Sequence, residues 1–174
     1  DLGINVPDFW AITSADELAD ALVALNGRGI VKTTTLGYDG KGQIAVDSTS
    51  DAKTVWEALG THQAILESFV SFSYEVSFLV WRTKQGETGC FPAAENRHEK
   101  GILARTVAPA PSLSPDLYDA GSAAAIKIAD AVGLEGVLAM EAFITTDGRM
   151  LFNEIAPRPH NSFHWTIEGC ETSQ

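Results

Sequence analysis

The sequence predicts an α+β fold in which helices and antiparallel sheets form two lobes. Short apolar strand segments joined by glycine-containing turns follow one another directly, which is typical of hairpins. Helical segments with capping signals stand beside these hairpins. The strand segments become longer and alternate more regularly towards the C-terminus, so we expect a smaller lobe at residues 1–66 and a larger lobe at residues 67–174.

Composition and charge exclude several classes of protein. The chain has 174 residues, 45% of them hydrophobic, and a formal net charge of −11, which argues against nucleic acid or an anionic membrane as partner. No apolar run approaches the length of a membrane span. Cys90 and Cys170 lie far apart without metal-ligand spacing, so nothing requires an oxidising compartment. Because the chain begins at Asp1 and ends in a polar stretch, we expect it to be a piece of a longer protein.

The smaller lobe is predicted as helix, hairpin and helix. Ser14 and Glu17 form a capping box that opens the first helix. Gly60 closes the second helix, whose apolar residues recur on one face. The segments that we expect are a helix from Ser14 to about Asn26, strands at residues 29–35 and 44–46, and a helix at residues 52–60.

The larger lobe is predicted to contain longer strands and one long helix. Residues 73–84 alternate, which places Tyr74, Val76, Phe78 and Val80 on one side and Glu75, Ser77, Leu79 and Trp81 on the other. Ser114 and Pro115 supply an N-cap and an N1 proline for the helix. The further segments that we expect are strands at residues 64–68, 88–91, 102–107 and 136–144, a helix at residues 115–132, and a strand beginning at Leu151.

Two acidic residues are expected to meet across the last hairpin. If Asp147 and Gly148 form a two-residue loop, Glu141 faces Glu154 on the neighbouring strand. Directly opposed side chains lie roughly 5 Å apart at Cβ, and like charges there are destabilising. Both acids are also expected on apolar faces, Glu154 on the face of Met150 and Phe152. One extra loop residue would instead place Asn153 opposite Glu141.

Two interpretations of the acid pair follow. A bridging divalent cation would remove the repulsion, and Mg²⁺ held by one or two carboxylates plus substrate phosphates is a common site of that kind. Alternatively, the hairpin lies at an edge and exposes both acids to water. Arg158 and His160, which follow the second strand closely, favour the metal interpretation.

A glycine-rich segment between the first two strands is the second candidate site. Gly37, Gly40 and Gly42 make a hairpin tip whose backbone N–H groups can approach a phosphate closely, although such a segment can also be a simple turn. It is not a Walker A loop, because no helix follows it. Lys32 lies in an apolar strand at the base of this segment, and with Lys41 it could grip a polyphosphate at two points.

Taken together, these motifs resemble the ATP-grasp family, and within it the carboxyaminoimidazole ribonucleotide synthetases of purine biosynthesis. The resemblance extends over nearly the whole chain. The matching motifs are Lys32, residues 37–43, residues 67–70, and Asn153-Glu154-Ile155-Ala156-Pro157-Arg158-Pro159-His160-Asn161-Ser162 with His164 to Gly169 behind it. It implies a nucleotide cleft enclosed by the two lobes.

The resemblance also implies roles for individual residues. The ATP phosphates would be held by Lys32, Gly37, Tyr38, Asp39, Gly40, Lys41, Gly42 and Gln43. The adenine would be read by the backbone of Glu67, Ser68, Phe69 and Val70, the ribose by Glu75, and His98 would lie near the nucleotide. Glu141 and Glu154 would bind Mg²⁺, with Mn²⁺ as an alternative, and Asn153 would lie beside them. Bicarbonate, carboxyphosphate or the ribonucleotide would meet Arg158, His160 and Asn161, and the aminoimidazole would meet Tyr38 and Asp39 on loop closure.

The activity implied is the carboxylation of 5-aminoimidazole ribonucleotide to its N5-carboxy form, with ATP and bicarbonate, through carboxyphosphate. A cytoplasmic, homodimeric ligase is implied as the full-length enzyme. Two alternatives remain open: another ATP-grasp ligase that forms an acyl phosphate, and a module that binds a Mg²⁺-nucleotide without turnover.

The chain departs from the family pattern at two residues and in its extent. Phe163 stands where glycine is expected, and Ala156 stands where many ATP-grasp enzymes have asparagine. The N-terminal Rossmann-like domain and the small C-terminal domain of the family are not part of this sequence.

Overall fold

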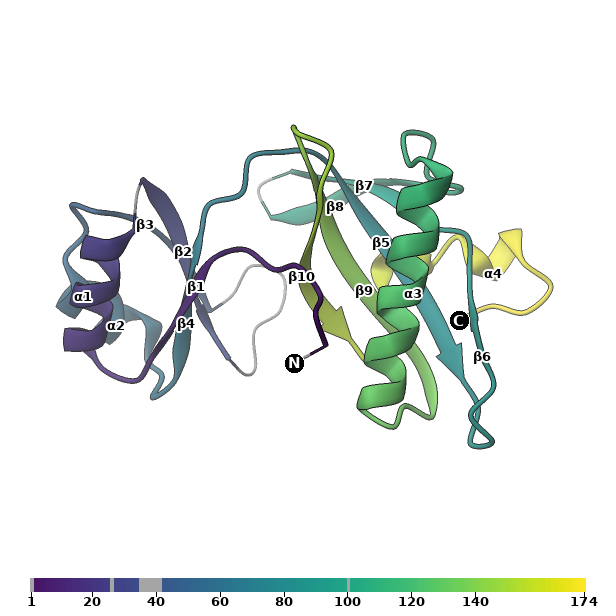
Figure 1. Cartoon of the computed structure of the whole chain (residues 1–174), viewed down its shortest axis with the longest axis horizontal. Coiled ribbons are helices and arrows are strands. Elements are labelled where there is room, and N and C mark those ends of the chain that lie inside the picture. The colour runs from purple at the N-terminus through teal and green to yellow at the C-terminus, as the bar shows by residue number, and fades with distance from the viewer. Residues whose placement is uncertain (1, 26, 35–41, 100) are drawn as a thin grey trace. The chain divides into compact units, whose positions relative to one another are not determined.

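The chain folds into two compact units, which a computed structural model describes for residues 2–25, 27–34, 42–99 and 101–174 (Figure 1). Residues 7–70 form the smaller unit, and the larger unit is residues 71–174 together with the first residues up to Val6. The N-terminal segment belongs to the larger unit because Asn5 O accepts a hydrogen bond from Phe152 N at 2.8 Å. The boundary lies after residue 70 and not after residue 66 because the strand at 64–68 is paired on both sides within the smaller unit.

The smaller unit is a four-stranded antiparallel sheet with two helices. Its elements are β1 (Phe9–Ile12), α1 (Ala15–Ala24), β2 (Arg28–Thr33), β3 (Gln43–Asp47), α2 (Ala52–Leu59) and β4 (Ala64–Ser68). The strand order is β1-β4-β2-β3. Ser14 caps α1 by accepting from Glu17 N, and Gly60 ends α2 in the left-handed conformation, as predicted. β1 was not predicted.

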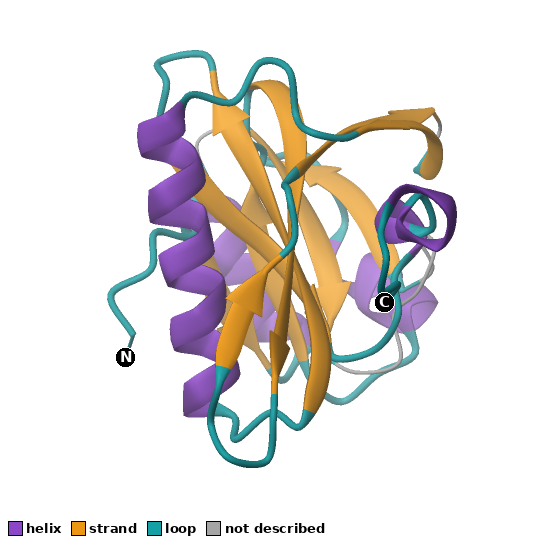
Figure 2. Cartoon of the chain, turned by 90° about the vertical axis from the view of Figure 1, so that its right-hand side faces the viewer, coloured by secondary structure: helices purple, strands orange, loops and turns teal. Residues whose placement is uncertain are grey.

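The larger unit is a six-stranded antiparallel sheet with one long helix on one face (Figure 2). Its elements are β5 (Phe72–Arg82), β6 (Thr88–Cys90), β7 (Ala94–Glu99), β8 (Ile102–Val107), α3 (Pro115–Ala131), β9 (Gly136–Thr145), β10 (Met150–Ala156), the 3₁₀ helix η1 (Asn161–Phe163) and α4 (Thr166–Gly169). The strand order is β10-β9-β5-β7-β8, and β6 pairs with β5. The architecture is therefore the α+β fold with antiparallel sheets that the sequence predicts.

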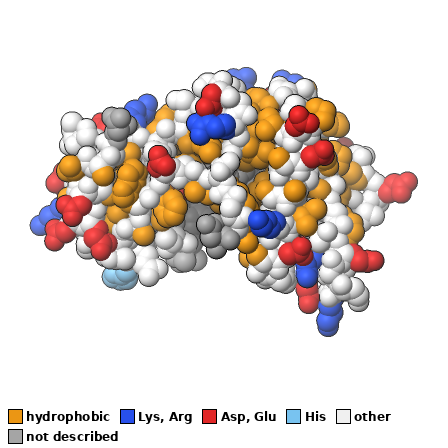
Figure 3. All heavy atoms as spheres, viewed as in Figure 1, with side chains coloured by type: hydrophobic (Ala, Val, Ile, Leu, Met, Phe, Trp, Pro, Cys, Tyr) orange, Lys and Arg blue, Asp and Glu red, His pale blue; other side chains and the backbone are white. Residues whose placement is uncertain are grey.

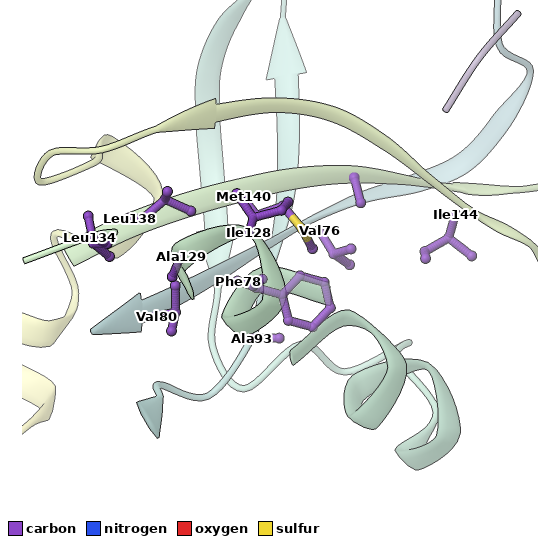
Figure 4. Packing of buried hydrophobic residues seen from close by; sticks show 12 residues of the cluster. Val76, Phe78, Val80, Ala93, Ile128, Ala129, Leu134, Leu138, Met140 and Ile144 are labelled. Atoms are coloured by element: carbon purple, nitrogen blue, oxygen red, sulfur yellow. The ribbon is translucent and has the colours of Figure 1, made fainter. Parts of the chain in front are cut away.

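The core of the larger unit lies between this sheet and α3 (Figure 4). Val76, Phe78 and Val80 alternate along β5 and are fully buried, as the sequence pattern predicts. Gly121 lets the helix approach, because a Cβ atom there would lie 2.1 Å from Phe78 Cζ.

The opposite face of the same sheet is apolar only in part. A second buried cluster on this face is formed by Leu79, Ala94, Ala139, Ala156 and Phe163. Further along β5 the same face carries Ser77 and Glu75. The polar residues therefore occupy one end of a sheet face whose other end is closed by η1.

The surface is mixed in charge. Acidic and basic side chains are interspersed with apolar ones on the face drawn in Figure 3. Within the described parts of the chain, no helix is both long and apolar enough to cross a membrane.

Candidate functional site

The two acids predicted to face each other do so, but the hairpin reaches this register by a different route. Thr145 N donates to Arg149 O at 2.9 Å, and Gly148 has φ 83°, so the loop has one residue more than predicted. Met150 therefore opposes Ile144, and Phe152 opposes Ala142. The register then shifts between Phe152 and Glu154, and Glu154 opposes Glu141. The extra loop residue and the bulge shift the strand register by one residue in opposite directions, so Glu141 and Glu154 still face each other.

The bulge at Asn153 also decides which face Glu154 occupies. Met150 and Phe152 pack against the core beneath α3. Regular alternation would place Glu154 on the same apolar face, and this was the prediction, which is wrong. The extra residue turns Glu154 to the other face, where it shares the side of Glu141. A bulge that re-aims one side chain in this way is common beside functional sites.

Glu141 lies in a confined, polar environment. Its side chain is 14% exposed, and Oε1 lies 3.5 Å from Ser77 Oγ and 3.8 Å from His160 Nε2. Burial, followed by the negative charge of Glu154, raises the pKa of Glu141 to about 7. Glu154 is exposed. The pair thus carries a repulsion that a cation would relieve.

Glu75 and His98 form an ion pair beside these acids. Glu75 lies on β5 and bonds to His98 Nδ1 on β7, and both side chains are mostly buried. The hydrogen bond to Glu75 raises the pKa of His98, and the charges of Glu75, Glu141 and Glu154 act in the same direction. The structure therefore brings the predicted ribose ligand, its neighbouring histidine and the two predicted metal ligands into one electrostatic cluster.

His160 is buried and held by its backbone. Its N–H donates to Gln174 Oε1 at 2.7 Å, and its carbonyl accepts from Gln174 Nε2 at 3.0 Å. The ring Nδ1 lies 2.8 Å from Ser162 Oγ. Burial, and then the charge of Arg158, lowers the pKa of His160 to about 4. His160 is thus neutral at pH 7, and its 3.8 Å approach to Glu141 is not an ion pair.

Gln174 was not among the predicted site residues. No signal in the sequence could have found it, because its role depends on a fold-back over 14 positions. The other two predicted residues of this segment, Arg158 and Asn161, are exposed and make local hydrogen bonds. Arg158 donates to Pro159 O at 2.9 Å, and Asn161 Oδ1 accepts from Ser162 N at 2.9 Å.

In the smaller unit, Lys32 is paired with Glu67. Lys32 Nζ lies 2.5 Å from Glu67 Oε2, and the two side chains are 16% and 13% exposed. Glu67 opposes Ile30 on the neighbouring strand, so it reaches Lys32 diagonally. Lys32 was predicted to bind phosphate because its charge lies in an apolar strand. The structure shows that this charge also has a protein partner, Glu67.

The last residue of β4 and the residue that follows it are hydrogen-bonded within the smaller unit. Ser68 N donates to Asp8 O and Phe69 N to Arg28 O, and the Arg28 guanidinium lies 4.8 Å from the centre of the Phe69 ring. Val70 ends the unit. These contacts use two of the N–H groups in the segment that was predicted to read adenine.

The glycine-rich segment is described only at its end. Thr33 N donates to Gly42 O at 2.9 Å, and Gln43 begins β3. The predicted phosphate and substrate residues Gly37, Tyr38, Asp39, Gly40 and Lys41 lie outside the described residues.

The acid pair could supply two carboxylates to a cation whose other ligands come from substrate phosphates and water. In the described part of the chain, no group of three or more His, Cys, Asp or Glu side chains is arranged to hold a metal ion. Two opposed carboxylates nevertheless match Mg²⁺, which usually binds through one or two carboxylates plus substrate phosphates and water.

We expect Glu141→Gln to stabilise the metal-free chain at pH 8 by about 1–2 kcal/mol and by clearly less at pH 5. The folded pKa of Glu141 is about 7, above the unfolded value of about 4.3, so the folded state keeps a proton that the unfolded state loses. Stability therefore falls as pH rises through this window. Glutamine removes that penalty, although it also loses the attraction to His98. Urea unfolding in EDTA at both pH values measures the difference.

The exposed Glu135 provides the control, because Glu135→Gln should change stability equally little at both pH values. An effect of Glu141→Gln that has the same size at pH 5 and pH 8 would contradict a raised pKa of Glu141 in the folded chain.

Comparison with known proteins adds independent evidence. The model of the ATP-grasp domain family matches residues 1–174. The N5-carboxyaminoimidazole ribonucleotide synthase of Bacillus subtilis is 40% identical over 172 residues, which cover 99% of this chain and 45% of that protein. The enzyme of the same name from Pseudomonas aeruginosa is 42% identical over 178 residues, covering 100% of this chain and 47% of that protein.

Solved structures agree. An ADP complex of an N5-carboxyaminoimidazole ribonucleotide synthetase is 41% identical with a TM-score of 0.88, covering 99% of this chain and 45% of that one. The Aspergillus clavatus enzyme in complex with ADP and 5-aminoimidazole ribonucleotide is 29% identical with a TM-score of 0.83, covering 98% of this chain and 44% of that one. The chain thus spans about half the length of the relatives it matches.

Proposed function

Because the chain belongs to the ATP-grasp family, we propose that it is the nucleotide- and metal-binding part of an enzyme that carboxylates 5-aminoimidazole ribonucleotide. ATP and bicarbonate would be consumed, and the product would be N5-carboxyaminoimidazole ribonucleotide. The observation that carries the proposal is the opposition of Glu141 and Glu154, which a bulge restores after a loop of unexpected length. The relatives with this name supply the substrate class.

Glu141 and Glu154 would hold Mg²⁺, with Mn²⁺ as an alternative. The cation would neutralise the charge that develops on the transferring phosphoryl group. The raised pKa of Glu141 supports this assignment, since a buried carboxylate beside a second one gains most from a cation. Asn153, the bulge residue, would set the direction of Glu154.

Roles in nucleotide binding are proposed for residues of each unit separately. Lys32, kept in place by Glu67, would contact the phosphates together with the glycine-rich segment from Gly37 to Gln43. Residues 67–70 would read the adenine. Glu75 and His98 would meet the ribose, and their ion pair supplies both a hydrogen-bond acceptor and a positive charge there.

The remaining predicted residues would contact bicarbonate and the ribonucleotide, as the family resemblance implies. A bicarbonate oxygen would attack the γ-phosphorus while the bond to the bridging oxygen of ADP breaks. The amine would then displace phosphate from carboxyphosphate, and the proton that the amine loses would pass to the released phosphate. The exposed guanidinium of Arg158 matches a carboxylate or phosphate in shape. Neutral His160 and exposed Asn161 would orient these groups, and Tyr38 and Asp39 would meet the aminoimidazole.

Phosphate release tests the proposal. We expect inorganic phosphate to be released only when the chain receives ATP, Mg²⁺, bicarbonate and 5-aminoimidazole ribonucleotide together. Release with a different acceptor would instead indicate another ligase that forms an acyl phosphate. A colorimetric phosphate assay with each component omitted in turn distinguishes these outcomes.

One observation favours a second candidate. The chain spans 45–47% of its relatives, so a module that binds Mg²⁺-nucleotide without turnover is the alternative for this chain. Binding of ATP measured by calorimetry, combined with no phosphate release in the complete mixture, would establish that alternative.

A further inference from the structure

A row of polar side chains crosses the sheet of the larger unit beneath Glu141. Glu141 on β9 opposes Ser77 on β5, and Asn96 on β7 opposes Thr106 on β8. Asn96 reaches Ser77 diagonally across β5 and β7. Ser77 and Asn96 are 0% and 6% exposed. Four adjacent strands thus each contribute one polar side chain to a single line that ends at a predicted metal ligand.

The hydrogen bonds in this line run in one direction. Thr106 Oγ1 donates to Asn96 Oδ1 at 3.0 Å, and Asn96 Nδ2 donates to Ser77 Oγ at 2.6 Å. Because a serine hydroxyl has only one proton, and its oxygen already accepts from Asn96, Ser77 directs that proton to Glu141 Oε1, 3.5 Å away. The opposite direction would turn a lone pair of Ser77 towards the carboxylate, so the observed order is the one in which Ser77 donates to Glu141.

The polar row borders the apolar part of this sheet face on one side and the Glu75–His98 pair on the other. On the same face of the sheet, Leu79, Ala94 and Ala139 form part of an apolar buried cluster. Buried polar groups are costly unless every one is hydrogen-bonded, and apolar side chains of similar size would avoid that cost. Every described member of the row is hydrogen-bonded, and the line of hydrogen bonds ends at Glu141.

The contacts of Glu141 show what the row would achieve. Ser77 Oγ and His160 Nε2 both approach the same carboxylate oxygen, Oε1. Glu141 and Glu154 would hold the cation while Oε1 keeps these two contacts. Holding Oε1 thus fixes the orientation of the carboxylate before a cation arrives, and such support around a metal ligand is a known determinant of metal affinity.

We propose that Ser77, Asn96 and Thr106 form a positioning relay that orients the Glu141 carboxylate for cation binding. The relay rests on the proposed function in one respect, namely that Glu141 and Glu154 bind the cation of the nucleotide. None of the three residues binds the cation or the nucleotide itself.

Metal affinity tests the relay. Mn²⁺ is titrated into the chain saturated with ADP, and free Mn²⁺ is measured by electron paramagnetic resonance. We expect Ser77→Ala to weaken Mn²⁺ binding about tenfold, as is typical for loss of a supporting residue. Thr106→Val, which is isosteric but lacks the hydroxyl, should weaken binding less and in the same direction. Thr106→Ser, which keeps the hydroxyl, should bind Mn²⁺ like the parent chain.

A purely structural row gives the reverse pattern. If Thr106 matters only for packing, Thr106→Ser should weaken Mn²⁺ binding because it loses a methyl group. Thr106→Val should then bind Mn²⁺ like the parent chain. The relay also predicts that Ser77→Ala with Thr106→Val binds Mn²⁺ no more weakly than Ser77→Ala alone, because both act through one proton donor. Losses that multiply, or unchanged binding in Ser77→Ala, would overturn the relay. Circular dichroism confirms that each variant is folded at the assay temperature.

The relay and the proposed function can fail separately. If Mn²⁺ binding depends on Ser77 but no phosphate is released, the relay is supported and the proposed carboxylation by this chain is contradicted. A parent chain that binds no Mn²⁺ in the presence of ADP would overturn the metal site and the relay with it.

Discussion

Glu154→Gln is expected to abolish the Mg²⁺-dependent part of the stabilisation that ATP gives the chain. Glutamine keeps the size of the side chain and removes the charge that a cation would bind. Because Glu154 is exposed and lies outside the apolar clusters, the substitution should leave the fold intact. A ligand at a hundred times its Kd stabilises by about 2.7 kcal/mol, and the variant should lose most of the share that requires Mg²⁺.

Thermal unfolding with ATP, in Mg²⁺ and in EDTA, measures this share. Glu135→Gln removes an exposed carboxylate from the same unit and should retain the full Mg²⁺-dependent shift. Glu141→Gln should lose it like Glu154→Gln. An undiminished Mg²⁺-dependent shift in Glu154→Gln would exclude a cation between these two acids.

Much of the fold could be predicted because the relevant signals are local. Ser14 caps α1 and Ser114 caps α3 through the hydrogen bonds that their sequence contexts indicate. The alternation along β5 separates the face that packs against α3 from the face that carries Glu75, Ser77 and Leu79, without any knowledge of its neighbours. β1, by contrast, is only four residues long and is defined by pairing with β4, so its own sequence carries little signal.

The acid pair shows how a correct prediction can rest on an incomplete reason. Thr145 Oγ1 accepts from Arg149 N at 2.9 Å, which stabilises a loop one residue longer than predicted. That loop alone would have placed Asn153 opposite Glu141. Phe152 is needed in the core beneath α3 while Glu154 carries a charge, and a bulge between them satisfies both demands. No local pattern encodes this compensation.

Contacts between distant residues were beyond sequence reasoning. The ion pair of Lys32 with Glu67, and that of Glu75 with His98, join residues for which separate nucleotide roles were predicted. Gln174 holds His160 across a turn of the chain that periodicity does not reveal. These partners are set by strand order and by the fold-back of the C-terminal segment.

Phe163→Ala is expected to destabilise the larger unit by about 4 kcal/mol, because removing a buried phenylalanine side chain typically costs about 3–5 kcal/mol. Phe163 is 0% exposed and packs in the cluster with Leu79, Ala94, Ala139 and Ala156. The resemblance to the family leads one to expect glycine at this position and, in many members, asparagine at 156. The structure places both departures in one buried cluster.

Urea unfolding of the chain measures the effect, with Ile167→Ala as the control, since Ile167 is 66% exposed and lies in the same C-terminal segment.

A double-mutant cycle then tests whether the effects of the substitutions at Ala156 and Phe163 depend on each other. Ala156→Asn alone should be strongly destabilising, because it forces an amide into an apolar cluster that Phe163 fills. In the Phe163→Gly background the added cost of Ala156→Asn should be smaller, with a coupling energy of about 1–2 kcal/mol. Additive costs would show that the two positions vary independently, and a Phe163→Ala variant as stable as Ile167→Ala would remove Phe163 from the core.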